Sequence, residues 1–258
     1  MDKDQEIKAN KTGKTGKKTD GERIAKVMAR AGVCSRREAE RWIESGRVQL
    51  NGQILTTPAT IVTDEDDIIV DDKALPKKER TRLFLYHKPA GLVTSNKDEQ
   101  GRTTIFDKLP KELPRVMTVG RLDINTEGLL ALTNDGELAR YLELPNNGFD
   151  RTYRVRAYGH TSQTQLDKLK KGIVHNKIRY KGIEAVMEKQ QGDNSWITVT
   201  LSEGKNREVR NVMEAVGLKV NRLIRTSYGP FQLGKIEKTA VLEIKHKMLK
   251  EQISGFFK

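Results

Sequence analysis

A polar segment from Gly120 to Leu130 holds the side chains best suited to catalysis. It lies between two apolar stretches that predict strands, and functional groups often stand on such loops at strand ends. Asp123 supplies a carboxylate, which can act as a nucleophile or as an acid and base. A structural role stays open on spacing alone, because Asp123 and Thr126 could simply bond to their own backbone.

Asp123 and Glu127 together could also be the two carboxylates of a glycoside hydrolase. Against this, Lys and Arg number 48 while Asp and Glu number 35, which leaves a formal charge of +13. A field of this sign attracts polyanions and would be an odd feature for a neutral sugar substrate. The charge therefore favours a nucleic acid partner over a sugar.

The sequence gives little support for metal, disulfide or membrane chemistry. Cys34 is the only cysteine, and the four histidines are scattered without metal-ligand spacing. No apolar run is long enough to span a bilayer, and the N-terminus lacks the apolar region of a signal peptide. We expect no metal, no cofactor, no membrane contact and a cytoplasmic protein in a reducing compartment.

Strands and helices alternate around the polar segment and would position it. The expected strands are 83–86, 116–119, 129–132, 153–158 and 196–201, and the expected helices are 163–171 and 206–216. The strands are short, partly alternating and often not separated by helices. This predicts an α+β domain at residues 82–250, with a mainly antiparallel sheet and flanking helices.

A smaller domain is expected before it, at residues 22–78. Apolar residues at helical spacing from Ile24 to Ala31 make one helix face, and a second helix begins at Ser35, which has capping-box spacing to Glu38. Short β elements follow, among them a hairpin turn at Asn51-Gly52. The small domain therefore reads as two packed helices followed by β structure.

Six basic side chains of this small domain face outward when the apolar faces turn inward: Lys26, Arg30, Arg36, Arg37, Arg41 and Arg47. Such a patch suits backbone phosphates and supplies placement rather than sequence reading. The plain alternative is a solvated charged face. Residues 1–20 consist largely of Lys, Thr and Gly with almost nothing to bury, so we expect a disordered basic tail there.

Two stretches of the small domain closely resemble the S4 RNA-binding domain. They are Ala29–Glu40, which reads Ala-Arg-Ala-Gly-x-x-Ser-Arg-Arg-Glu-Ala-Glu, and Gly46–Gly52, which reads Gly-Arg-Val-x-x-Asn-Gly. The resemblance implies an RNA-binding module made of two helices and small β elements.

The larger domain resembles the pseudouridine synthases of the RsuA/RluB type. Their catalytic motif matches Gly120-Arg121-Leu122-Asp123 followed by Asn125-Thr126-x-Gly128-Leu129-Leu130. Further motifs match in the same order: Lys88-Pro89-x-Gly91, Arg102-Thr103-x-x-x-Asp107-x-Leu109-Pro110, Arg151-Thr152-Tyr153-x-Val155, Glu203-Gly204-x-Asn206-Arg207-Glu208-Val209-Arg210 and Arg222-Leu223-x-Arg225. The resemblance extends from Glu22 to about Leu242.

This resemblance implies that the chain isomerises a uridine of ribosomal RNA to pseudouridine, with Asp123 as the nucleophile. It implies that Tyr153 packs against a uracil that has left its stack, and that Arg210 is the basic partner of Asp123. Arg207 remains open as the alternative partner. Three further contacts with RNA are expected, from Arg121, Arg151 and Arg207.

The stretch 203–210 is more similar to the large-subunit branch of the family than to the small-subunit branch. We therefore expect the chain to act on large-subunit ribosomal RNA. The sequence leaves the oligomeric state open, and a monomer is the default expectation. The main alternative is a noncatalytic S4-domain RNA-binding or ribosome-assembly protein, although such a protein would not need Asp123, Tyr153 and Arg210 together. A nucleic-acid glycosylase is a third possibility and would leave an abasic product.

Overall fold

The structure of the protein is a computed structural model that describes residues 21–257. The expected disordered tail at residues 1–20 lies outside the described residues. The chain divides after Lys78 into two compact units. None of the helices within residues 21–257 is both long and apolar enough to cross a bilayer.

The first unit packs two helices, α1 (Ile24–Arg30) and α2 (Arg36–Glu44), against short strands. The Ser35 hydroxyl accepts from the Glu38 amide, and the Glu38 carboxylate accepts from the Ser35 amide at 2.7 Å, so the predicted capping box is confirmed. The strands are β1 (Glu22–Arg23), β2 (Val48–Leu50), β3 (Gln53–Ile54), β4 (Ile61–Val62), β5 (Ile68–Val70) and β6 (Lys73–Ala74). The apolar helix faces meet the strands in a core that includes Ile24, Met28, Ala39, Ile43, Val48 and Ile68.

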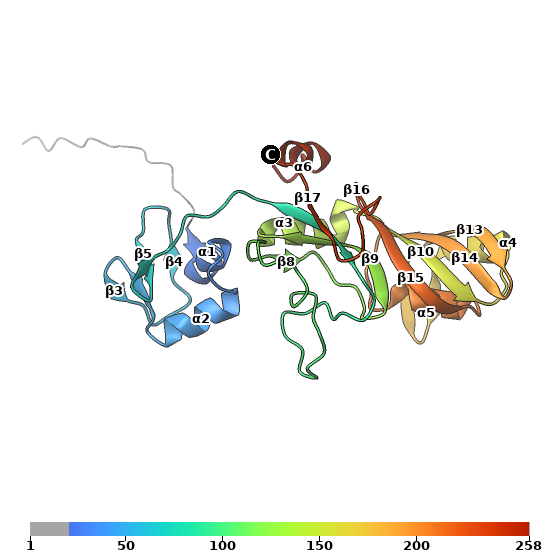
Figure 1. Ribbon diagram of the computed structural model, residues 1–258, viewed down its shortest axis with the longest axis horizontal. Helices are drawn as coiled ribbons and strands as arrows, with labels where there is room; N and C mark the ends of the chain where they lie inside the picture. Colours follow the sequence, from blue (N-terminus) through green and yellow to red (C-terminus); the bar gives the residue numbers. More distant parts are fainter. Residues whose placement is uncertain (1–20, 258) are drawn as a thin grey trace, which may run out of the picture. The chain divides into compact units, whose positions relative to one another are not determined.

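The second unit is built on one large sheet with the central strand order β13-β14-β10-β15-β9-β7-β17 (Figure 1). Its strands are β7 (Leu83–Lys88), β8 (Met117–Thr118), β9 (Thr126–Thr133), β10 (Arg151–Tyr158), β13 (Glu184–Gln191), β14 (Asn194–Leu201), β15 (Lys219–Tyr228), β16 (Phe231–Gln232) and β17 (Val241–Glu243). Strands β11 (Ile173–His175) and β12 (Ile178–Tyr180) form a separate hairpin. All pairings in the large sheet are antiparallel except that of β9 with β15. The predicted α+β class with a mainly antiparallel sheet is confirmed.

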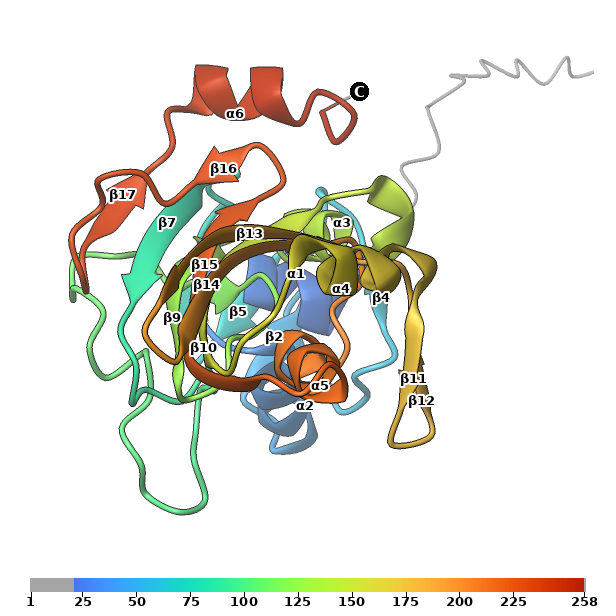
Figure 2. The ribbon, with the colours of Figure 1, turned by 90° about the vertical axis from the view of Figure 1, so that its right-hand side faces the viewer.

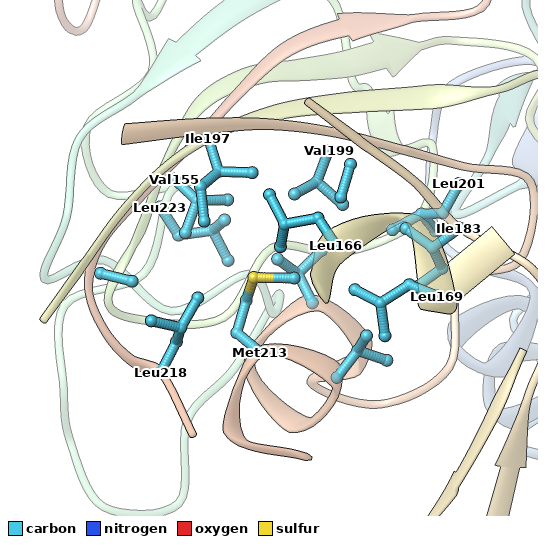
Figure 3. Close-up of a cluster of buried hydrophobic side chains, with 14 of the residues drawn as sticks. Val155, Leu166, Leu169, Ile183, Ile197, Val199, Leu201, Met213, Leu218 and Leu223 are labelled. Carbon is cyan, nitrogen blue, oxygen red and sulfur yellow. The ribbon is translucent and has the colours of Figure 1, made fainter. Parts of the chain in front are cut away.

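Helices flank this sheet: α3 (Gly136–Glu143), α4 (Gln163–Asp167), α5 (Glu208–Ala215) and α6 (His246–Gln252). Helices α4 and α5 lie on the same face of β10, β14 and β15 (Figure 2). Val155, Ile197 and Leu223 from these strands meet Leu166 of α4 and Met213 of α5 in one buried core (Figure 3). The alternate residues of the same strands face away from both helices, because side chains alternate across a strand.

The parallel pair of β9 and β15 brings two backbones very close at Gly128. Gly128 has a φ of +106°, and a Cβ at this position would lie 2.2 Å from the carbonyl oxygen of Arg225. Only glycine fits such a contact with such a backbone angle. The close pairing fixes the start of β9, and with it the polar segment that precedes it, against β15.

Candidate active site

A cleft of about 990 Å³ opens where the polar segment meets β10, β15 and residues 203–209. Five predicted site residues of the second unit lie in its lining: Arg121, Asp123, Arg151, Tyr153 and Arg207. Asp123 belongs to the turn between Gly120 and Thr126, where β9 begins. The structure therefore brings together side chains that lie up to 86 positions apart in the sequence, from Arg121 to Arg207.

The Lys88 side chain binds the backbone carbonyls of this turn. Its side chain is fully buried at the end of β7, and Nζ donates to the carbonyl oxygens of Asp123, Ile124 and Thr126 at 3.3, 3.3 and 3.0 Å. Nζ also donates to the carbonyl of Pro89 at 3.0 Å. Burial lowers the pKa of Lys88 to about 8, against the opposing influence of the Asp123 and Glu127 carboxylates.

Other parts of the chain fasten the same turn. The Gly91 amide donates to the Ile124 carbonyl at 2.7 Å, the Thr94 hydroxyl to the Leu122 carbonyl at 2.8 Å, and the Gly120 amide to the Glu143 carboxylate at 2.7 Å. Arg210 Nη2 donates to the Asn125 carbonyl at 3.0 Å. Each carbonyl from Leu122 to Thr126 thus accepts from a donor outside the turn, which fixes the backbone that presents the Asp123 side chain.

The cation closest to the Asp123 carboxylate is Arg207, with 3.8 Å between Nη1 and Oδ2. Arg210 forms no ion pair with Asp123 in this structure. Its guanidinium donates to the carbonyls of Asn125 and Val220, and it sits half-buried. Burial and the nearby charge of Arg207 lower the pKa of Arg210, while Asp123 raises it, so Arg210 still lies within the electrostatic reach of the carboxylate.

The predicted helix 206–216 begins two residues late, at Glu208, and this changes the relation between the two arginines. Arg207 is the residue before the helix and has a φ of 51°, in the left-handed region. Arg207 therefore does not share a helix face with Arg210. The left-handed backbone instead turns Arg207, whose side chain is 53% exposed, toward the Asp123 side of the cleft.

Tyr153 stands on β10 beside the cleft, half-buried and packed against two apolar clusters. Arg151, two residues earlier on β10, is expected from the sequence to contact RNA, but it is only 7% exposed. Arg151 donates to the Ser202 carbonyl at 2.7 Å and to the Tyr228 hydroxyl at 2.9 Å. These internal bonds favour a supporting role for Arg151 over a phosphate contact.

The six basic residues of the first unit differ in their contacts and in their exposure. Lys26 forms an ion pair with Glu22 at 2.7 Å, and Arg47 bonds to Asp71 and stacks over Trp42, with 4.5 Å from its Cζ to the ring centre. Arg30 is half-buried on α1. On α2 the exposed positions include Arg36, Arg37 and Arg41, so the outward basic face of this unit is made chiefly by this helix.

The Glu127 side chain lies outside the cleft that Asp123 lines. Its carboxylate, 10% exposed, accepts from Arg222 at 2.7 and 3.0 Å and lies 3.1 Å from Lys238, and it does not line the cleft. These contacts hold the pKa of Glu127 at about 2, well below its ordinary value of 4.5. The arrangement does not pair Asp123 and Glu127 as the carboxylates of a glycoside hydrolase.

Glu127→Gln is expected to lower the free energy of unfolding at pH 7 by about 1 kcal/mol, since both basic partners are partly exposed and screened. Because the pKa of Glu127 is depressed in the folded state, its carboxylate contributes fully to stability above the unfolded pKa of 4.5. This contribution is lost as the pH falls toward 2. The difference between wild type and variant should therefore shrink to less than half by about pH 3 in urea titrations. Glu112→Gln, at an exposed position, serves as the control. A difference that grows on acidification would contradict the assignment.

Comparison with known proteins gives one consistent result. Residues 82–215 match a family described as RNA pseudouridylate synthase, and residues 22–68 match the S4 domain. An RNA pseudouridine synthase of Rickettsia felis is 44% identical over 230 residues, which cover 89% of this chain and all of that protein. Ribosomal large subunit pseudouridine synthase B of Salmonella typhi is 42% identical over 227 residues, covering 83% of this chain and 76% of that protein.

Among solved structures, a crystal structure of a pseudouridylate synthase superposes with a TM-score of 0.64 at 26% identity. The superposition covers 90% of this chain and 99% of the other. The similarity therefore extends through both units, and is not limited to the residues around Asp123.

Proposed function

This chain belongs to the RNA pseudouridine synthase family, and we propose that it converts one uridine of large-subunit ribosomal RNA into pseudouridine with Asp123 as the catalytic carboxylate. The observation that carries the proposal is the Asp123 side chain, presented into a cleft beside Tyr153 by a turn whose backbone is held at every carbonyl from Leu122 to Thr126. The large-subunit substrate rests on the similarity to ribosomal large subunit pseudouridine synthase B of Salmonella typhi. Similarity along both units also disfavours a noncatalytic RNA-binding protein.

The reaction breaks the bond between N1 of uracil and C1′ of the ribose and forms a bond between C5 and C1′. Atoms and oxidation state are conserved, since the proton lost from C5 is matched by one gained at N1. The Asp123 carboxylate either adds to C1′ or assists the departure of uracil by elimination, and each route needs the ionised form. The Arg207 guanidinium lies 3.8 Å from this carboxylate, and the half-buried Arg210 is a second cation within its electrostatic reach.

The target nucleotide must leave its stack to reach the cleft. Tyr153 offers a ring beside Asp123 on which the freed uracil can pack during its rotation. Arg121, exposed at the rim, and the exposed arginines of α2 supply phosphate contacts that place the RNA. In this proposal Arg151 acts indirectly, by fixing the position of Tyr228 and residues 202–203.

The proposal is tested by mapping pseudouridines in ribosomal RNA from cells that lack the gene. One large-subunit site should disappear and return when the wild-type gene is restored. Purified protein should then form pseudouridine at that site in RNA from the deletion strain. A complete set of large-subunit sites in the deletion strain, together with no activity of the purified protein on that RNA, would refute the proposed substrate.

A further inference from the structure

Four strands of the second unit, β13, β14, β10 and β15, have a second face, opposite to the face that α4 and α5 cover. The buried core under α4 and α5 takes Val155, Ala157, Ile197 and Val199 from one side of these strands. The alternate residues point to the other side, where Arg156 is exposed and Tyr158 is 54% exposed. None of the residues on this other side that are named below lines the cleft.

A row of unusual composition crosses the centre of this face. Arg156 on β10 is directly opposite Trp196 on β14 and directly opposite Arg222 on β15. Two arginines opposite each other in an antiparallel pair repel, so this register costs stability. Glu127 balances the charge of Arg222, so an anion bound at Arg156 would remove the repulsion that remains.

Two acidic residues of this face, Glu188 and Glu127, are already engaged. Glu188 binds Arg154 at 2.9 Å, and Glu127 binds Arg222 and Lys238. The Arg156 side chain makes no hydrogen bond or ion pair with any residue in the described range 21–257, so its guanidinium is available to a ligand.

Trp196 adds an aromatic surface next to the free guanidinium. The Arg154 guanidinium lies over its ring, with 4.5 Å from Cζ to the ring centre, and the indole Nε1 donates to Gln191 at 3.3 Å. The ion pair with Glu188 and the indole hydrogen bond hold this stacked pair in place. A rigid aromatic ring beside arginines is what unstacked bases and their phosphates bind on open β-sheets.

We propose that this face, defined by Arg154, Arg156, Tyr158, Trp196 and Arg222 and called here the back-face platform, is a second RNA-binding surface of the enzyme. Its ligand is a single-stranded segment of the same ribosomal RNA, with a phosphate on Arg156 and a base against Trp196 or Tyr158. The inference rests on the proposed function for the identity of the RNA. RNA is favoured over a protein partner because positive charges outnumber negative ones on this face and the whole chain carries +13.

The test measures the affinity of purified variants for ribosomal RNA from the deletion strain as a function of salt. Arg156→Glu should weaken binding about tenfold near 0.1 M salt, and Arg156→Gln should reduce the slope of log affinity against log salt by about one. Lys247→Glu, the same reversal of charge at an exposed position of α6, should change affinity less than twofold. The rate at saturating RNA should stay at the wild-type value, because Arg156 is outside the cleft.

Two further measurements separate binding from folding and from the proposed function. Arg156→Glu should melt no lower than wild type, because the repulsion with Arg222 becomes an attraction. In a Trp42→Phe background Trp196 is the only tryptophan, and RNA should quench its fluorescence. Equal affinity of Arg156→Glu and Lys247→Glu, or a change in oligomeric state without a change in RNA affinity, would overturn the platform. A wild-type protein that fails to modify the RNA would instead overturn the proposed function, because the affinity and fluorescence readings do not depend on activity.

Discussion

Asp123→Asn is expected to reduce the rate of pseudouridine formation by about 10⁴-fold or more, as losses of catalytic nucleophiles do. The amide has nearly the shape of the carboxylate but carries no charge and does not add to C1′ or assist uracil departure. Single-turnover conversion of the target RNA by excess enzyme measures this directly. The same variant should leave binding of the RNA within about threefold of wild type, because most RNA affinity comes from phosphate contacts elsewhere.

The stability of Asp123→Asn should stay within about 1 kcal/mol of wild type. The bonds that hold the turn use the Asp123 backbone and not its side chain, and the 3.8 Å contact with the exposed Arg207 is weak. Asp193→Asn, an exposed aspartate on the turn before β14, is the matched control and should keep full activity. If Asp123→Asn kept more than a hundredth of the wild-type rate, the nucleophile would have to be sought elsewhere in the cleft.

The parts of the fold that follow from local pattern were predictable from the sequence. The second helix of the first unit begins at its Ser35 cap as expected, because capping is decided within four residues. The strand expected at 129–132 lies inside β9, whose eight residues are all buried. Its start at Thr126 was not expected, since polar Thr126 and Glu127 are buried by contacts with β15 that lie far away in the sequence.

Strand β15 shows why the rest was not predictable. It is the longest strand and the one that joins the two halves of the sheet, yet its sequence from Lys219 to Tyr228 alternates only partly. Its pairing with β9 is parallel, which departs locally from the expected antiparallel sheet. Such a pairing depends on the approach permitted by Gly128, and the sequence shows only that a glycine is present.

The residues of the candidate site also differ in how far the sequence predicts them. Asp123 and Tyr153 were predictable because they lie in motifs with a family resemblance. Lys88 also lies in such a motif. Its bonds to the carbonyls of Asp123 and Thr126 become visible only in the folded structure, because these residues lie far from Lys88 in the sequence. A lysine that ends an apolar strand run was a signal that this residue has an unusual partner. The contact of Glu143 with Gly120 had no signal in the sequence at all.

Lys88→Met is expected to destabilise the protein by about 2–4 kcal/mol, because it leaves buried carbonyls of the turn that presents Asp123 without their donor. Methionine fills a similar volume, so the loss reports the missing ammonium and not a cavity. The rate of the remaining folded protein should fall by about 10²-fold or more, since a displacement of the proposed nucleophile Asp123 by about 1 Å would have that effect. Urea unfolding and single-turnover kinetics at a temperature where the variant is folded measure the two effects separately.

The pH dependence distinguishes Lys88 from a residue that only packs. Its folded pKa of about 8 lies below the ordinary 10.5, so between these values the unfolded chain binds the extra proton and stability through this group rises with pH. The stability advantage of wild type over Lys88→Met should therefore increase from pH 8 to pH 10. Lys111→Met, at an exposed position, should show neither the destabilisation nor the slope. A Lys88→Met protein with wild-type stability and rate would mean that the turn is held without Lys88, and that the remaining bonds from Gly91, Thr94 and Arg210 suffice to present Asp123.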